Sequence, residues 1–120
     1  MDIDKLLRES AQKIDGCEAV SLVGTDGIAL ATHTRDSDAD LTLADAQLAT
    51  LSTTAENISK DIGAGEIYEI ILVTEKMIIV VGFIGEDFYI YYALSGEKKN
   101  AGLARYEIKR LASELRGFLY

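Results

Sequence analysis

An α+β domain is the fold class that the sequence predicts, with a five-stranded antiparallel sheet that carries one helix on one face and two helices on the other. Three observations lead to this prediction. Helical and strand-like periodicities follow one another as helix, two strands, helix, three strands and helix within 120 residues. The segment Met77–Ile84 carries no polar side chain, so both faces of its strand need cover. The absence of proline leaves every backbone N–H free for helices and sheets, and the length fits a single domain over residues 1–120.

The first elements are a short amphipathic helix and a β-hairpin. Asp2 or Asp4 can cap the helix. Its inward residues at helical spacing are Ile3, Leu6, Leu7, Ala11 and Ile14. The hairpin has strands over Cys17–Val23 and Ile28–Thr32, joined by a tight turn at residues 24–27 that contains two glycines.

A long central helix and a three-stranded meander follow. The apolar residues of this helix step by three or four positions and are Ala44, Leu48, Leu51, Ala55, Ile58 and Ile62. The helix ends at the glycines of residues 63–65. Strands are predicted over Ile67–Thr74, Met77–Ile84 and Phe88–Leu94, with the aromatic run of residues 88–92 packed within the sheet.

The last helix begins after Asn100, whose side chain can cap it. Its predicted inward residues are Leu103, Ala104, Ile108, Leu111, Leu115 and Phe118. Its predicted outer residues, which are charged at nearly every turn, are Arg105, Glu107, Lys109, Arg110, Glu114 and Arg116.

The composition argues against several classes of protein. The chain has 20 Asp and Glu against 12 Lys and Arg, a formal net charge of -8, which disfavours nucleic acid and anionic membranes as partners. No apolar stretch approaches the roughly 20 residues of a membrane span. Cys17 is the single cysteine and cannot form an internal disulfide, and the amino terminus does not resemble a secretory signal. A cytoplasmic location is therefore expected.

No motif predicts catalysis, a metal or a cofactor. Asp36, Asp38 and Asp40 have the spacing that opens a calcium loop, but Leu41 stands where that loop needs glycine and Gln47 where it needs glutamate. The glycines at residues 63–65 and 96–102 lack the remainder of a dinucleotide or phosphate-binding fingerprint.

The single histidine, His33, has no catalytic partner at a recognisable spacing, and Cys17 begins a strand, as a buried structural cysteine would. We therefore expect a protein that is not an enzyme.

One surface has the composition of a protein interface. The central helix carries no charge between Asp45 and Glu56, and protein interfaces are depleted of charged residues. The side of this helix that we expect to face away from the core carries Gln47, Thr50, Ser52, Thr53 and Thr54. The alternative is a helix that simply faces water. In addition, the strand Ile67–Thr74 is an apolar candidate for a sheet edge, which pairing with a second copy would protect.

These elements together resemble the roadblock / dynein light-chain family, including its MglB type. The resemblance begins with the first helix, Leu6-Leu7 to Ile14-Asp15-Gly16, and the hairpin motif of residues 24–31, Gly-Thr-Asp-Gly-Ile-Ala-Leu-Ala. It continues with the central helix that ends in Gly63-Ala64-Gly65-Glu66, and with Gly102-Leu103-Ala104-Arg105 at the start of the last helix. It covers nearly the whole chain and implies the three-layer fold that roadblock domains share with profilin.

The resemblance also implies a function. It implies a homodimer in which the third strands of the two chains pair into one sheet and the central helices lie side by side. It also implies that this dimer is a non-catalytic regulator, scaffold or activating co-factor of a small Ras-like GTPase. The implied partner-binding residues are Ala46, Gln47, Thr50, Thr53, Thr54 and Asn57. The implied dimer contacts are Leu51, Ile58, Tyr68, Ile70 and Leu72. Arg35, before the central helix, is the arginine nearest to that surface and a weak candidate for an arginine finger.

Two alternatives remain open from the sequence. The first is a structural dimerisation adaptor for a motor, kinase or filament complex, which would bind its partner irrespective of guanine nucleotide. The second is a profilin-like module that senses a small ligand in a pocket beside the sheet.

Overall fold

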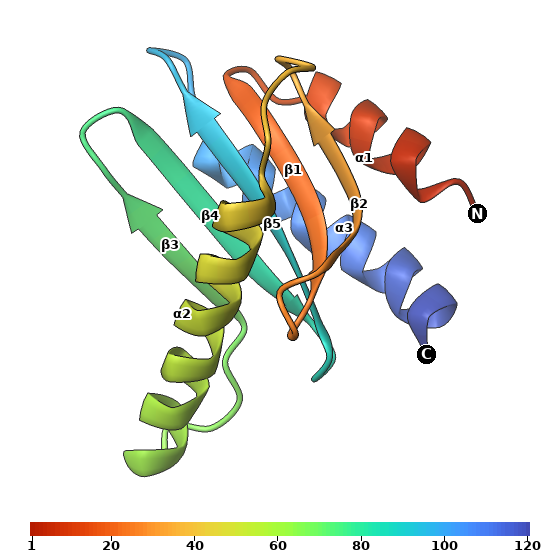
Figure 1. Cartoon of the computed structure of the whole chain (residues 1–120). Helices are drawn as coiled ribbons and strands as arrows, with labels where there is room; N and C mark the ends of the chain where they lie inside the picture. Colours follow the sequence, from red (N-terminus) through yellow and green to blue (C-terminus); the bar gives the residue numbers. More distant parts are fainter.

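The computed structural model describes residues 1–120 as three layers, with helices on both faces of a central sheet (Figure 1). The elements are α1 (Ile3–Gln12), β1 (Cys17–Gly24), β2 (Ala29–Thr34), α2 (Thr42–Asp61), β3 (Glu69–Val73), β4 (Met77–Ile84), β5 (Phe88–Ser95) and α3 (Ala101–Leu119). Helices α1 and α3 lie on one face and α2 on the other (Figure 1). The predicted order and layers are confirmed. The main shifts are that β2 ends at Thr34 rather than at Thr32, and that β3 spans Glu69–Val73 rather than Ile67–Thr74.

The sheet is antiparallel throughout and has the order β2-β1-β5-β4-β3. The prediction that β4 is an interior strand is confirmed, because β5 and β3 flank it. The prediction that the meander begins with an edge strand is also confirmed, since β3 pairs with β4 alone. The second edge is β2, which pairs only with β1.

The larger core lies between the sheet and the pair α1 and α3. Its fully buried members include Leu7 of α1, Leu22 of β1 and Leu111 of α3. Gly82 of β4 lets α3 approach closely, because a Cβ at this position would lie 2.2 Å from the Cγ2 atom of Ile108. The predicted caps also form: Asp2 accepts a hydrogen bond from the Lys5 amide, and Asn100 accepts one from the Leu103 amide.

The smaller core lies under α2 and involves only the first half of that helix. Leu48 and Ala49 pack there against Val23, Tyr89 and Tyr91 of the sheet. The second half of α2 extends past the sheet and away from it (Figure 1). The helix is therefore fixed at one end and projects at the other.

Some predicted orientations on the helices are wrong. Ser52 was assigned to the outer side of α2 but is buried, and it donates a 2.8 Å hydrogen bond to the Leu48 carbonyl, which allows its small side chain to face the core. Glu107 was assigned to the solvent side of α3 but is only 1% exposed, because polar partners surround it. Phe118, predicted to be inward, is exposed in the last turn of α3.

Local hydrogen bonds stabilise the acidic segment of residues 36–40, which follows β2. The Asp38 amide donates to the Asp36 carboxylate, and Asp40 accepts from both the amide and the hydroxyl of Thr42. These two hydrogen bonds lower the pKa of Asp40. The segment thus leads into α2 with a carboxylate near the helix amino terminus, where negative charge is favourable. None of the three helices combines the length and the hydropathy that a membrane span requires.

Candidate interaction surface

The six residues assigned to partner binding all lie exposed on α2, and we call them the α2 surface. They are Ala46, Gln47, Thr50, Thr53, Thr54 and Asn57. The surface contains no charge, and it faces away from the sheet side of the helix, where Asp45, Leu48 and Ala49 are buried. The sequence therefore located this exposed face correctly, apart from Ser52.

The threonine hydroxyls of the α2 surface are occupied within the helix itself. Thr50 donates to the Ala46 carbonyl at 3.3 Å, Thr53 to the Ala49 carbonyl at 3.2 Å, and Thr54 to the Thr50 carbonyl at 3.0 Å. A hydroxyl that already donates to the carbonyl four residues earlier has no donor left for a partner. The surface therefore presents fewer free hydroxyl donors than its composition indicates, and its free side-chain donors are the amides of Gln47 and Asn57.

Exposed apolar side chains continue from α2 to the edge of the sheet. On α2 and just beyond it, Leu51, Ile58 and Ile62 are exposed, with Ile58 at 55%. Tyr68, ahead of β3, is 76% exposed. We call the following group the edge cluster: Leu51, Ile58, Ile62, Tyr68, Ile71, Leu72 and Val73.

The edge cluster contains four of the five predicted dimer contacts. The fifth, Ile70, is partly buried against the smaller core. It shares this face of the sheet with Leu72, whereas Ile71 and Val73 point to the other face, because side chains alternate along a strand. Exposed apolar side chains that gather beside a free sheet edge are typical of interaction sites.

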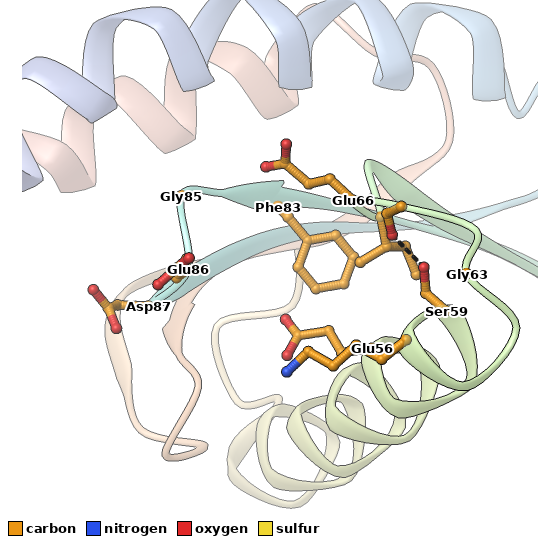
Figure 2. Close-up of a pocket in the computed structure, with 11 residues that line it drawn as sticks. Glu56, Ser59, Gly63, Glu66, Phe83, Gly85, Glu86 and Asp87 are labelled. Atoms are coloured by element: carbon orange, nitrogen blue, oxygen red, sulfur yellow. Dashed lines mark hydrogen bonds between the residues drawn. The ribbon is translucent and has the colours of Figure 1, made fainter.

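A hollow of about 870 Å³ separates the second half of α2 from the sheet. Its lining includes Phe83 of β4, the carboxylates of Glu56, Glu66 and Glu86, and the ammonium group of Lys60. Figure 2 shows the Phe83 ring facing Glu56 across this space, and the hydroxyl of Ser59 bonded to the Gly65 carbonyl. Because charged side chains line this space, no apolar core forms beneath the end of α2.

The first half of α2 is held by two buried tyrosines. The Tyr91 hydroxyl donates to a carboxylate oxygen of Asp45 at 2.7 Å, and the Tyr89 hydroxyl donates to the Asp45 backbone carbonyl. Burial and the nearby Asp45 charge raise the pKa of both phenols, which remain protonated donors. Asp45 is 5% exposed, and the hydrogen bond from Tyr91 is the one that compensates its buried carboxylate, since the bond from Tyr89 goes to the backbone.

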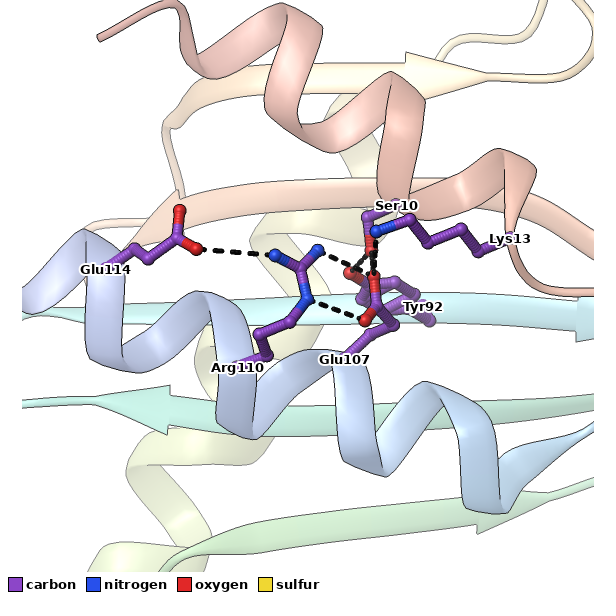
Figure 3. A network of polar contacts seen from close by, with 6 residues as sticks. All are labelled: Ser10, Lys13, Tyr92, Glu107, Arg110 and Glu114. Carbon is purple, nitrogen blue, oxygen red and sulfur yellow. Dashed lines mark hydrogen bonds and ion pairs between the residues drawn. The ribbon is translucent and has the colours of Figure 1, made fainter.

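A second buried polar network joins α1, β5 and α3 on the opposite face (Figure 3). Arg110 donates two hydrogen bonds to Glu107, at 2.8 and 2.9 Å, and the Ser10 hydroxyl donates a third at 2.8 Å. The Tyr92 hydroxyl lies 2.5 Å from Ser10. Lys13 is 4.0 Å from Glu107. These contacts cross between helices far apart in sequence and fix α1 against α3.

Two residues considered for catalysis, Cys17 and His33, line the same small hollow, but no hydrogen bond joins them, and the Cys17 thiol contacts the Ala19 carbonyl instead. Cys17 is buried, and burial raises the pKa of its thiol to about 11. The hollow that Cys17, His33 and Arg35 line lies beside the end of α1, on the opposite side of the sheet from α2. The placement of Arg35 near the α2 surface is therefore wrong, and Arg35 forms an ion pair with Glu18 instead. No group of three or more His, Cys, Asp or Glu side chains is arranged to hold a metal ion.

Comparisons with known proteins agree with this architecture. A family model described as mitogen-activated protein kinase kinase 1 interacting matches residues 1–116. Curated protein sequences yield no match. The structure is similar to the Roadblock/LC7 domain of Streptomyces avermitilis, with a TM-score of 0.88 and 19% identity over 99% of this chain and 98% of that one.

Two Myxococcus xanthus proteins are also similar. MglB superimposes with a TM-score of 0.83 and 18% identity over 99% of this chain and 98% of that chain. MglC superimposes with a TM-score of 0.68 and 27% identity over 98% and 99%. The chain thus has the roadblock fold, of the MglB-like type, and it belongs to the mitogen-activated protein kinase kinase 1 interacting family.

Proposed function

We propose that the protein is a non-catalytic, dimeric regulator or scaffold that binds a small Ras-like GTPase through the α2 surface. The observation that carries this proposal is the uncharged face of α2, whose threonine hydroxyls are bonded to their own helix. Such a face buries with little loss of hydration, because few free donors and no charges need to leave water. On a chain with a net charge of -8, an uncharged surface of this size is distinctive.

The edge cluster supports the dimeric part of the proposal. A second copy that pairs along β3 would satisfy the free edge of this strand and cover Ile71, Leu72 and Val73. The same approach would place a second helix against Leu51 and Ile58. Two α2 surfaces would then lie side by side and form one wider surface for a partner.

The GTPase is the partner that the roadblock and MglB resemblance implies, and nucleotide state distinguishes it from other partners. Small Ras-like GTPases of the source organism are loaded with GDP or with a non-hydrolysable GTP analogue and tested for binding, and GTP hydrolysis is measured with and without this protein. We expect binding that depends on the nucleotide and a changed hydrolysis rate. If no GTPase binds in either state and hydrolysis is unaltered, this proposal is wrong.

A pair of variants locates the binding face. Thr53→Lys combined with Thr54→Lys puts two charges on the α2 surface and should abolish GTPase binding while the fold is retained. Ser113→Lys is the matched control, because Ser113 is exposed on α3, on the far side of the sheet. Equal GTPase binding by both variants would show that the α2 surface is not the binding site.

The family description supports a second candidate function. It names an interaction with mitogen-activated protein kinase kinase 1, and an adaptor that holds a protein kinase would use the same dimer without sensing nucleotide. Binding that is identical for the GDP and GTP-analogue states, or binding to a kinase alone, would favour this candidate over the GTPase regulator.

A further inference from the structure

The strand β2 offers an unpaired edge at the side of the sheet opposite β3. It is hydrogen-bonded only to β1. The Arg35 amide donates to the Glu18 carbonyl at 2.9 Å, which places the amides of alternate residues toward β1. The amides of Thr32 and Thr34 therefore point outward. The 3.0 Å contact between the Ser21 and Thr32 hydroxyls agrees, because side chains approach most closely at the pairs that share no backbone bond.

The β2 edge lacks the proline and charged side chains that usually prevent an edge strand from pairing with another chain. Residues 29–34 include no proline, lysine or other charged side chain. A bulge opposite Leu22 and Val23 inserts Leu30, which is 48% exposed, and the neighbouring Ile28 is 68% exposed. Free backbone donors and exposed apolar side chains thus lie together along one line, which is the arrangement that strand addition uses.

The two ends of β2 are negatively charged. Asp26 lies in the turn before the strand, and Asp36, Asp38 and Asp40 follow it. None of the ion pairs in the molecule includes these four carboxylates. The nearest basic side chain in sequence, Arg35, is already paired with Glu18. A segment that pairs with β2 therefore meets uncompensated negative charge at both ends.

We propose that the β2 edge binds an extended segment of a partner protein, with Lys or Arg at both ends of that segment, by adding it as a sixth strand. Complementary charge favours this occupant over others. A second copy of β2 is disfavoured, because antiparallel pairing would bring Asp26 of one copy beside Asp36 of the other at each end. The β2 edge includes no residue of the α2 surface or of β3, so the inference does not rest on the proposed function.

The test uses the full chain and a synthetic peptide in which valine and threonine alternate between terminal pairs of lysines. We expect this peptide to slow hydrogen exchange of the Thr32 and Thr34 amides and to bind more weakly as salt is added. The same peptide with terminal glutamates should not bind. The lysine peptide N-methylated at alternate amides should not bind either, because one edge of its backbone can no longer form strand hydrogen bonds. This control leaves the protein itself unchanged.

A pair of variants tests the outward amide directly. Thr32→Pro removes the amide and the hydroxyl, whereas Thr32→Val removes only the hydroxyl, and proline is tolerated at an edge position whose N–H faces solvent. With folding checked by circular dichroism, Thr32→Pro should weaken binding about tenfold relative to Thr32→Val, as the loss of one hydrogen bond predicts. Equal affinity for the two variants, protection at β3 or α2 instead of β2, association of the chain with itself through β2, or no binding of the lysine peptide would each overturn the proposal.

Discussion

Glu107 illustrates how a charge is kept inside this molecule. Its side chain is almost fully buried, and each carboxylate oxygen accepts a hydrogen bond from Arg110, with Ser10 as a further donor. Paired, charge-assisted bonds of this kind offset the cost of removing a carboxylate from water. The hydrogen bonds from Arg110 hold the pKa of Glu107 below its ordinary value of 4.5, against the opposing effect of burial.

This lowered pKa predicts an acid dependence of stability. A carboxylate whose pKa is lower in the folded state than in the unfolded state stabilises the fold at pH values above its unfolded-state pKa. That stabilisation is lost as the pH falls through the folded-state pKa. The free energy of unfolding should therefore decrease below pH 4.5. Glu107→Gln should be less stable at neutral pH and should show a weaker acid dependence. Urea denaturation of both proteins over this range measures the effect, and parallel curves would contradict it.

Cys17 should behave as an inert thiol in the folded protein. Because burial raises the pKa of this thiol to about 11, almost no thiolate is present at neutral pH. Reaction with iodoacetamide should therefore be far slower than for a free peptide thiol, whose pKa is about 8.5. Mass spectrometry follows the reaction, and the urea-unfolded chain is the control. Labelling of the native chain as fast as that of the control would contradict the burial of this residue.

At the scale of elements, α2 is the helix that the core secures least. Only its first half packs on the sheet, and the Tyr91 hydroxyl there donates to the buried carboxylate of Asp45. Tyr91→Phe should destabilise the protein by about 1–3 kcal/mol, since a buried acceptor loses its donor. Tyr68→Phe is the matched control, because Tyr68 is exposed and should lose almost nothing. Denaturant titration measures both, and an equal effect would contradict the anchoring role of Tyr91.

The helices also show where sequence reasoning reached its limit. Periodicity located α2 and α3 and their caps, because spacing and capping residues are local properties of the chain. It misplaced Ser52 and Glu107, since burial of a polar side chain depends on partners elsewhere. Glu107 is buried because Ser10, nearly a hundred positions away in sequence, donates to it. No local pattern marks such a pair.

At the scale of the whole molecule, the order of elements, the sheet and its layers could be predicted, because alternating apolar patterns and glycine turns determine them. The exposed face of α2 could also be predicted from its missing charges. The position of Arg35 could not, because the strand β2 continues to Thr34 and carries that residue to the side of α1. A pocket beside the sheet was one alternative from the sequence, but the position and charged lining of the hollow under α2 could not be predicted, since they depend on how far the helix leans from the sheet.

The charge of the molecule and its apolar surface act in opposite directions on assembly. A net charge of -8 disfavours the approach of a second copy, whereas the edge cluster favours it. Full burial of one isoleucine contributes about 1.5–3 kcal/mol, so the apolar contribution dominates if several members of the cluster become covered. Added salt should therefore strengthen the dimer by screening the repulsion between copies.

Sedimentation equilibrium tests the central claim, a dimer built on the edge cluster, most directly. We predict a particle of twice the 13.1 kDa chain mass. Ile58→Lys should dissociate it, with the dissociation constant raised at least about tenfold, because a charge replaces an apolar side chain that is exposed in the single chain and would be covered in the dimer. Ser113→Lys should leave it intact. A wild-type protein that stays monomeric at every concentration, or an Ile58→Lys variant as dimeric as the wild type, would contradict the account.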